Sequence, residues 1–244
     1  MRWDTCSLTL ALWIGVGLAR AGETPEELLR ESDITLAPAF FQARVTLTQI
    51  EGQQLSLEVF RAGESRTLVQ FLDAKERGKY LLKRDGVLWF LSPRAKAPVK
   101  LHPSYRLSGG ASLDDILGTR YSHEYRILGA TDTTDGLVAL QLQAREPTAR
   151  HPRVYYFVAR ASRRPVRIEF RSPSGKATGS VEFKEWEEGS QPRPRRLLVT
   201  DMLRPKADVA VEISEVSERA VPDALFDLED GSARRALERS AFRR

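Results

Sequence analysis

The sequence predicts a mainly β protein, built on one strongly curved antiparallel sheet that carries two or three short helices. Three observations support this fold class. Apolar and polar residues alternate with a period of two in many successive segments, as in strands that bury one face. Turn-forming pairs such as Asp85-Gly86 separate these segments. Helical patterns are confined to a few short stretches.

The N-terminal segment has the features of a secretory signal. Residues 8–18 form an apolar run of 11 residues, and Ala19-Arg20-Ala21 follows it. The run is too short to span a bilayer but is typical of a signal-peptide core with its cleavage site. We expect a signal peptide over 1–21, cleaved after Ala21, and a single domain over 22–244; a buried N-terminal helix is the alternative. Cys6 lies inside this signal, so we expect no disulfide or lipid anchor in the mature chain.

The first helix is expected from about Pro25 to Asp33. Thr24 can cap it, proline suits the first helical position, and Glu27 completes a capping box. The residues that would face the interior from this helix are Leu28 and Leu29.

A second short helix is expected over 112–117, after the pair Gly109-Gly110. Ser112 can cap it, and the Asp114-Asp115 pair favours the helix dipole. The tail 231–244 has helical spacing of its apolar residues and a basic face.

Strands are expected over most of the remaining chain. The first lie over 41–49, 54–61 and 67–73, and a hairpin over 79–92 turns at Asp85-Gly86. Prolines and the glycine pair mark 93–110 as loop or edge strand. Later strands are expected near 121–128, 137–145, 154–159, 166–171, 180–186, 195–203 and 209–216. The total is about eleven or twelve strands.

Such a sheet must cover its apolar face, and the expected helices are too short to cover it completely. An apolar cavity under a small lid is one result, and such a cavity suits acyl chains. A fully packed sandwich fits the same pattern. We predict that the cavity is lined by Val45, Leu47, Leu57, Val59, Phe71, Leu82, Trp89, Leu91, Ile168, Phe170 and Phe183. We predict that the lid contributes Leu28, Leu29, Ile116 and Leu117.

The residues that could carry chemistry form no recognisable constellation. His102, His123 and His151 lack metal-ligand spacing and read as surface or strand residues, and no serine lies in a G-x-S-x-G elbow. We therefore expect no enzyme activity, no cofactor and no metal; a hydrolase whose triad assembles from distant positions is the alternative. The net charge of +5 is spread along the strands, which does not indicate a nucleic-acid binder.

The segment 79–118 resembles the outer-membrane lipoprotein-sorting proteins, periplasmic carriers related to LolA. The features that carry the resemblance are the run 89–94 (WFLSPR), the glycine pair leading into the acidic helix, and the closing segment 221–230 (VPDALFDLED). It is strongest over 40–130. One departure is that close relatives have aromatic residues around the acidic helix, where this chain has Ala111, Ser112 and Leu113.

The resemblance implies a half-open curved antiparallel β-barrel of about 11 strands, with short helices as a lid over an apolar cavity. It implies a monomeric periplasmic carrier of acylated lipoprotein or lipid cargo, with an inner-membrane transporter or an outer-membrane acceptor as a further partner. A module of the same fold that senses lipidated or misfolded envelope proteins is the alternative. Gly109-Gly110 would let the lid helix hinge, and Arg44 either holds the lid or is a solvated strand residue.

Overall fold

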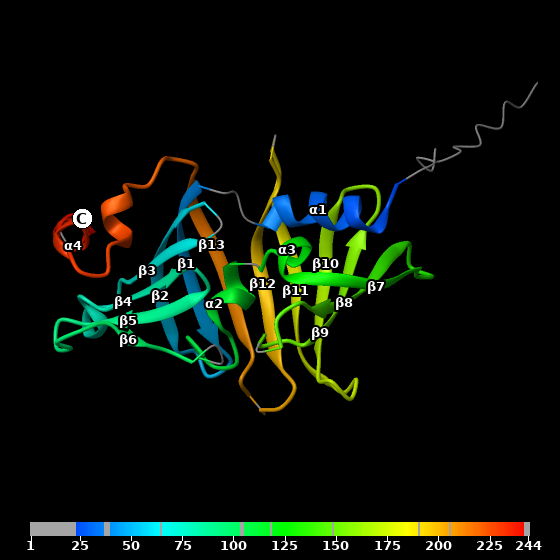
Figure 1. Ribbon diagram of the computed structural model, residues 1–244, viewed down its shortest axis with the longest axis horizontal. Helices are drawn as coiled ribbons and strands as arrows, with labels where there is room; N and C mark the ends of the chain where they lie inside the picture. The colour runs from blue at the N-terminus through cyan, green and yellow to red at the C-terminus, as the bar shows by residue number, and fades with distance from the viewer. Residues whose placement is uncertain are drawn as a thin grey trace, which may run out of the picture.

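One antiparallel sheet organises the chain in the computed structural model, which describes residues 23–36, 40–63, 65–102, 105–117, 119–147, 149–189, 191–204 and 206–241. The sheet has 13 strands in the order β6-β5-β4-β3-β2-β1-β13-β12-β11-β10-β9-β8-β7 (Figure 1). Neighbouring strands follow one another along the chain except at the centre, where β1 pairs with β13. The predicted cleavage after Ala21 lies outside the described residues.

The strands divide into two groups on either side of the central pair. The first group is β1 (Phe40–Gln49), β2 (Gln54–Ala62), β3 (Arg66–Phe71), β4 (Tyr80–Arg84), β5 (Val87–Leu91) and β6 (Val99–Lys100). The second is β7 (Tyr125–Asp132), β8 (Leu137–Ala144), β9 (Arg153–Ala159), β10 (Arg164–Arg171), β11 (Ala177–Glu187), β12 (Arg193–Asp201) and β13 (Val209–Ser217). The helices are α1 (Pro25–Leu36), η1 (Ala74–Glu76), α2 (Leu113–Leu117), α3 (Tyr121–Glu124), η2 (Asp223–Phe226) and α4 (Ser232–Ala241).

Local sequence chemistry explains the element boundaries. Thr24 and Glu27 exchange backbone and side-chain hydrogen bonds of 3.2 Å, which confirms the predicted capping box of α1. Asp85 and Gly86 both have positive φ, 51° and 77°, as a two-residue hairpin turn of type I′ requires. In β1, residues 41, 43, 45 and 47 are buried and their neighbours are partly exposed, as the alternation predicted.

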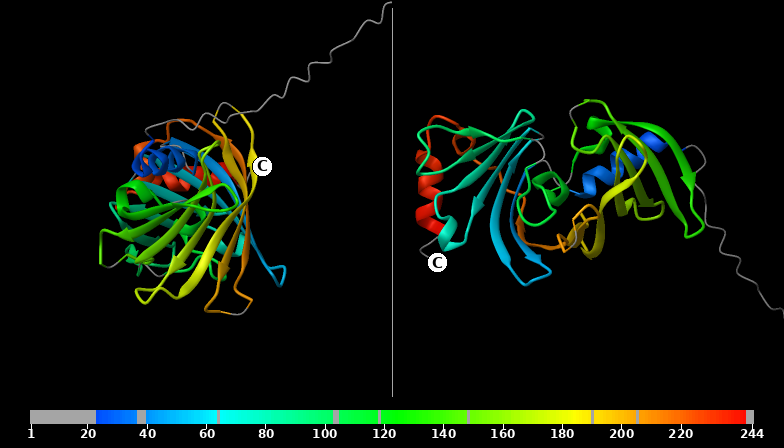
Figure 2. Two further views of the ribbon diagram at one scale, coloured as in Figure 1. Left: turned by 90° about the vertical axis from the view of Figure 1, so that its right-hand side faces the viewer. Right: turned by 90° about the horizontal axis from the view of Figure 1, so that it is seen from below.

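The sheet bends so that its two groups of strands form two lobes, which the right-hand view in Figure 2 shows side by side. Register shifts occur in β1, β7, β10 and β11. Such bulges increase local bend and twist. The segment 101–124, which includes α2 and α3, joins β6 to β7, the two edge strands of the sheet (Figure 1). The predicted curved open sheet with short helices is confirmed.

Three boundaries differ from the sequence prediction. The strand expected from Tyr121 begins at Tyr125, because residues 121–124 form α3, which buries the Tyr121 side chain. The first helix continues to Leu36 instead of ending at Asp33. The segment expected to be loop or edge strand contains the two-residue strand β6, so the sheet has 13 strands in the described residues.

Apolar side chains fill two separate clusters. The inner cluster lies between the curved sheet and α1, α2 and α3, and it includes residues from both lobes. The outer cluster lies on the opposite face of β2 to β5, where η2 and α4 cover it. Its buried members are Phe60, Ala62, Leu68, Tyr80, Leu82, Leu91, Leu225 and Phe226.

Candidate functional site

The candidate site is the inner cluster and its helical cover. Leu28 and Leu29 of α1, Leu113, Ile116 and Leu117 of α2, and Tyr121 of α3 are all buried in it. The strand residues beneath them are apolar and come from both lobes of the sheet. Three short helices therefore cover one continuous apolar surface.

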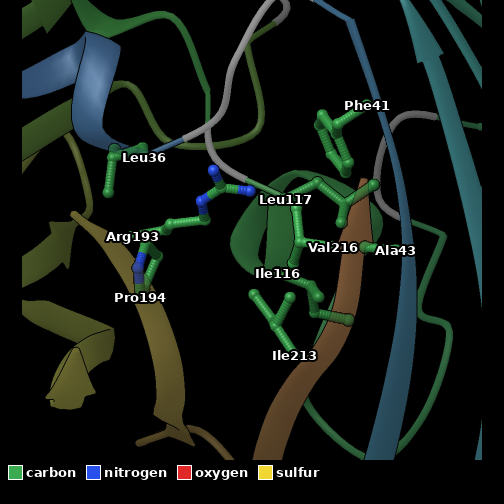
Figure 3. A pocket seen from close by; sticks show the side chains of 9 residues that line it. All are labelled: Leu36, Phe41, Ala43, Ile116, Leu117, Arg193, Pro194, Ile213 and Val216. Atoms are coloured by element: carbon green, nitrogen blue, oxygen red, sulfur yellow. The ribbon is translucent and has the colours of Figure 1, made fainter. Parts of the chain in front are cut away.

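A narrow apolar pocket remains under this cover, between the end of α1, α2 and the central strands. Figure 3 shows Ile116 and Leu117 of α2 near Ile213 and Val216 of β13. The lining residues are Leu36, Phe41, Ala43, Ile116, Leu117, Arg193, Pro194, Ile213 and Val216. The cavity volume is about 30 Å³, which is the space of a single water molecule in the liquid. The sequence predicted an apolar cavity under the helices. The structure has an apolar pocket there, which in this conformation is too small for an acyl chain because side chains of the protein fill most of the interior.

The N-terminal end of α2 is held by a buried carboxylate. Asp115 Oδ2 accepts a hydrogen bond of 2.9 Å from the Ser112 backbone N–H, and the Ser112 hydroxyl accepts one of 3.3 Å from the Asp115 N–H. The same carboxylate lies 3.2 Å from Arg150 Nη2 and 3.0 Å from His151 Nε2. Burial raises the pKa of Asp115, but the hydrogen bond and charge of His151 and the charge of Arg150 outweigh it and hold the pKa below its usual value.

Cations from the first lobe hold α2 at its C-terminal end and also at its first turn. Arg61 of β2 donates a hydrogen bond of 3.4 Å to the Leu117 carbonyl oxygen and stacks over the Phe41 ring at 5.4 Å. Burial lowers the pKa of Arg61 to about 10, so the guanidinium stays protonated at neutral pH. Lys83 Nζ lies 2.6 Å from Asp114 Oδ1 at the surface. Contacts with side chains from three different parts of the chain thus attach α2 to the sheet.

A second polar contact joins α1 to α3 and to the sheet. Asp33 Oδ2 accepts hydrogen bonds from the Ser122 backbone N–H at 2.7 Å and from its hydroxyl at 2.6 Å. Ser32 Oγ and Tyr156 Oη lie 2.7 Å apart. Asp33 Oδ1 is buried without a partner in the described residues. Burial raises the pKa of Asp33 to about 6, because the charged form loses hydration that the two Ser122 bonds replace only in part.

Comparison with known proteins identifies the family and the fold. A family model described as "Uncharacterized protein" matches residues 63–230, which is more than half of the chain. The chain belongs to the family that this model describes. No curated protein matches the sequence.

Solved structures supply the fold. A LolA superfamily protein from Nitrosomonas europaea is 23% identical, with a TM-score of 0.74, covering 84% of this chain and 98% of that one. A putative outer membrane lipoprotein-sorting protein domain from Vibrio parahaemolyticus is 13% identical, with a TM-score of 0.65, covering 87% and 97%. A DUF1329 family protein from Desulfovibrio piger is 14% identical, with a TM-score of 0.61, covering 83% and 95%. The chain has the LolA-like fold.

Most residues predicted to line the interior lie in the inner cluster of this LolA-like fold. Buried there are Val45, Leu47, Leu57, Val59, Phe71, Ile168 and Phe170, together with the predicted lid residues Leu28, Leu29, Ile116 and Leu117. Phe183 is partly buried against the same cluster. Of these residues, only Ile116 and Leu117 line the narrow pocket.

The predicted positions of Leu82, Trp89 and Leu91 are wrong. Leu82 and Leu91 are buried in the outer cluster, and Trp89 packs against it. The neighbour Leu81 takes the inner position, because Leu81 pairs with Val69, which in turn pairs with Val59. Consecutive apolar residues in β4 gave no alternation from which the inner face could be read.

Arg44 does not hold the lid in this structure. It lies on β1 between buried Ala43 and Val45, so it points to the opposite face, where its Nη1 is 2.6 Å from Glu215 Oε1. The glycine pair serves close packing. Gly110 N–H donates a hydrogen bond of 2.7 Å to the Ala207 carbonyl oxygen, and a Cβ on Gly110 would lie 2.5 Å from the Asp201 Cβ.

Sequence reasoning missed Arg61, Asp33 and the Asp115–Arg150–His151 group. The alternation along β2 could have identified Arg61, because Leu57, Val59 and Arg61 are spaced two residues apart and therefore share the inner face. His151, expected at the surface or in a strand, is 17% exposed and stacks on Phe170 with ring centroids 3.6 Å apart. In the described part of the chain no hydroxyl group joins the His151–Asp115 pair to complete a triad.

Among the described residues, no group of three or more His, Cys, Asp or Glu side chains is arranged to hold a metal ion. No helix among these residues has the length and apolar character needed to cross a membrane.

Proposed function

We propose that this protein is a periplasmic carrier that binds acyl chains of lipids or lipoproteins in its inner apolar cluster and moves them between envelope membranes. The observation that carries the proposal is a continuous apolar surface covered by three separate short helices, each attached through polar contacts. The LolA-like fold supports it, since one relative of that fold is described as a putative outer membrane lipoprotein-sorting protein domain. Under this proposal the mature chain begins after Ala21.

In the described conformation the helical cover is closed over the apolar surface. Because the pocket of about 30 Å³ cannot hold an acyl chain, loading requires Ile116 and Leu117 to leave the pocket. The acyl chain then covers the apolar surface that these side chains covered before. Each buried methylene contributes about 0.8 kcal/mol, so a chain of 16 carbons gains on the order of 10 kcal/mol before the costs of association.

The polar groups that hold α2 set the cost of opening. Arg61, Arg150 and His151 bind groups of α2 that water can solvate once the helix moves outward. The acyl chain packs against the strands in the place that Ile116 and Leu117 leave, so the strands stay covered. A cover attached in this way can therefore detach without unfolding the sheet.

Native mass spectrometry of protein purified from its own cell envelope tests the proposal directly, because a carrier should retain bound lipid. A matched pair of variants then locates the site. Ala43 lines the inner pocket and Ala62 lies in the outer cluster, and each is 1% exposed. In Ala43→Leu the added carbons displace about two methylenes of cargo, which lowers affinity for a fluorescent fatty-acyl probe about tenfold.

Ala62→Leu is the control, since it overpacks the other cluster by the same volume. It should leave probe affinity unchanged, with thermal unfolding confirming that both variants fold. Purified protein that carries no lipid and does not bind the acyl probe would rule out the carrier. Equal loss of affinity in the two variants would place the acyl site elsewhere.

A further inference from the structure

A larger, polar pocket borders α2 and shares no lining residue with the narrow apolar one. Loops that join β8 to β9, β10 to β11 and β12 to β13 form it together with the segment that precedes α2. Its volume is about 320 Å³, at the lower end of the range for small-molecule sites. Its lining includes the polar or charged side chains of Arg106, Arg150, His151, Thr200 and Asp201, and the ring of Phe170.

Charges in this pocket are arranged in two layers. The carboxylates lie at the back: the side chains of Asp115 and Asp201 are 3% and 4% exposed. The cations lie in front of them, with Arg150 at 13% and Arg106 at 25% exposed. Arg106 Nη1 is 3.0 Å from Asp201 Oδ2, and Arg150 Nη2 is 3.2 Å from Asp115 Oδ2. The surface that an entering molecule meets is therefore cationic.

One backbone oxygen, the carbonyl of Gly110, also orients the guanidinium groups of Arg106 and Arg150. The Gly110 carbonyl accepts hydrogen bonds from Arg106 Nη1 at 2.5 Å and from Arg150 Nη2 at 3.3 Å. A guanidinium carries five donors in a rigid fork, which suits the oxygens of a phosphate or carboxylate. Arg171 also borders the pocket, but its guanidinium binds Glu169 at 2.8 Å and stacks on Tyr155.

Asp115 connects this pocket with the cover of the apolar site. Its carboxylate lines the polar pocket, whereas the next two residues of α2, Ile116 and Leu117, line the apolar pocket. An amphiphile with its polar group in the polar pocket and its acyl chain in the apolar pocket would lie across α2. An anion that binds Arg150 and His151 also competes with Asp115 for them, which weakens the attachment of α2.

We infer that the polar pocket binds an anionic group of the phosphate type, and that this group releases α2 by replacing the Asp115 carboxylate at Arg150 and His151. The inference rests on the proposed function for the acyl half of the ligand. The phosphate could belong to a lipid head group or be free in solution, and the experiment separates these sources.

The test compares three probes on the purified protein by calorimetry: lysophosphatidylglycerol, a monoacylglycerol with the same acyl chain, and inorganic phosphate alone. We expect lysophosphatidylglycerol to bind at least about tenfold more tightly than the monoacylglycerol, since a hydrogen bond to a charged group contributes about 1.5–3 kcal/mol. Arg106→Gln should remove this preference and leave monoacylglycerol affinity unchanged. Arg167→Gln is the control, because Arg167 stacks on Phe157 on the outer face of the sheet.

Asp115→Asn separates competition at the anion site from a simple loosening of α2, because the two predict different changes in lipid affinity. It removes the competing carboxylate, so the preference for the phosphate-bearing lipid should increase, whereas a merely loosened lid would raise affinity for both amphiphiles equally. Equal affinity of the two amphiphiles for the wild-type protein overturns the inference and leaves the carrier standing. If the protein binds inorganic phosphate but neither amphiphile, the result supports the anion site and rules out the carrier.

Discussion

Both faces of the curved sheet are covered by helices, the outer face at β2 to β5 and the inner face across both lobes, but the covers are attached differently. On the outer face, Arg234 of α4 donates hydrogen bonds to the carbonyl oxygens of Leu225, at 3.2 Å, and Asp227. These bonds tie α4 to η2, so the outer cover packs on the sheet as one unit. On the inner face, α1 and α2 are attached by separate contacts, one at Asp33 and the others at Asp115 and Arg61.

The difference indicates a permanent cover on one face and a removable one on the other. Tyr80 Oη, in the outer cluster, donates a further hydrogen bond of 3.0 Å to the Arg234 carbonyl oxygen, and η2 buries its own Leu225 and Phe226 in that cluster. The outer cover holds the buried Arg234 together with this apolar contact, whereas the inner cover is attached mainly through buried ionisable groups at Asp33, Arg61 and Asp115, which is a costly way to gain stability. Such contacts hold a helix in place yet allow it to leave.

The largest expected effect comes from a charge placed in the inner cluster. Leu47 is fully buried on β1, and Leu47→Glu would leave a carboxylate there without a partner. The cost is several kcal/mol, enough to unfold a domain of ordinary stability, and cargo retention should be lost with the fold. Thermal unfolding followed by circular dichroism measures this loss of stability.

Leu57→Glu should behave like Leu47→Glu, because Leu57 is 1% exposed in the same cluster. The control is Thr48→Glu, at the end of β1 on its partly exposed face, which should change the free energy of unfolding by less than about 1 kcal/mol. A folded Leu47→Glu protein that still carries a full lipid load would show that the faces are assigned wrongly.

A matched pair of truncations separates the two faces directly. Leu81 and Leu82 are neighbours on β4, both fully buried, one in the inner and the other in the outer cluster. Each change to alanine should cost about 2–5 kcal/mol in the free energy of unfolding. Acyl-probe affinity should change only in Leu81→Ala. Equal changes of acyl-probe affinity in both variants would contradict the proposal that only the inner face binds the acyl chain.

The contact between α1 and α3 should make stability depend on pH. Burial raises the pKa of Asp33 from 3.8 to about 6 in the folded protein. The folded state therefore favours the protonated form, and stability is lost as pH rises from about 4 to about 6. The total is about 3 kcal/mol, since each pKa unit corresponds to about 1.4 kcal/mol.

Asp33→Asn removes this titration and provides the matched control. The wild-type protein should lose about 3 kcal/mol relative to the variant between pH 4 and pH 7, measured by urea unfolding at each pH. Parallel curves for the two proteins would show that Asp33 titrates normally and does not strain the inner cover.

The smallest effect is expected at the surface of α2. The ion pair between Lys83 and Asp114 is partly exposed, with side chains 27% and 41% accessible. Lys83→Ala should therefore change the free energy of unfolding by less than about 1 kcal/mol. A larger change would mean that the N-terminal half of α2 depends on this pair more than on Asp115.

The sequence was most informative where the structure is local. The capping box of Thr24 and Glu27, the Asp85-Gly86 turn and the alternation in β1 all depend on residues close together in the chain. It was least informative where a strand is apolar on both faces, as at Leu81 and Leu82. There the inner face is set by which segment packs on which side, and η2 lies about 140 residues further along the chain.

By itself, then, the sequence determined the strands, their turns, the capped short helices and the kind of curved sheet they form, because each follows from neighbouring residues. Only the tertiary structure decided which apolar residues face inward, that they fill the interior, and that Arg61, Asp33 and Asp115 hold the cover. Those contacts join residues that are 35 to 89 positions apart, such as Asp115 with Arg150 and Asp33 with Ser122. No periodic pattern records such pairs, since each member is a single polar residue whose partner is chosen by the fold.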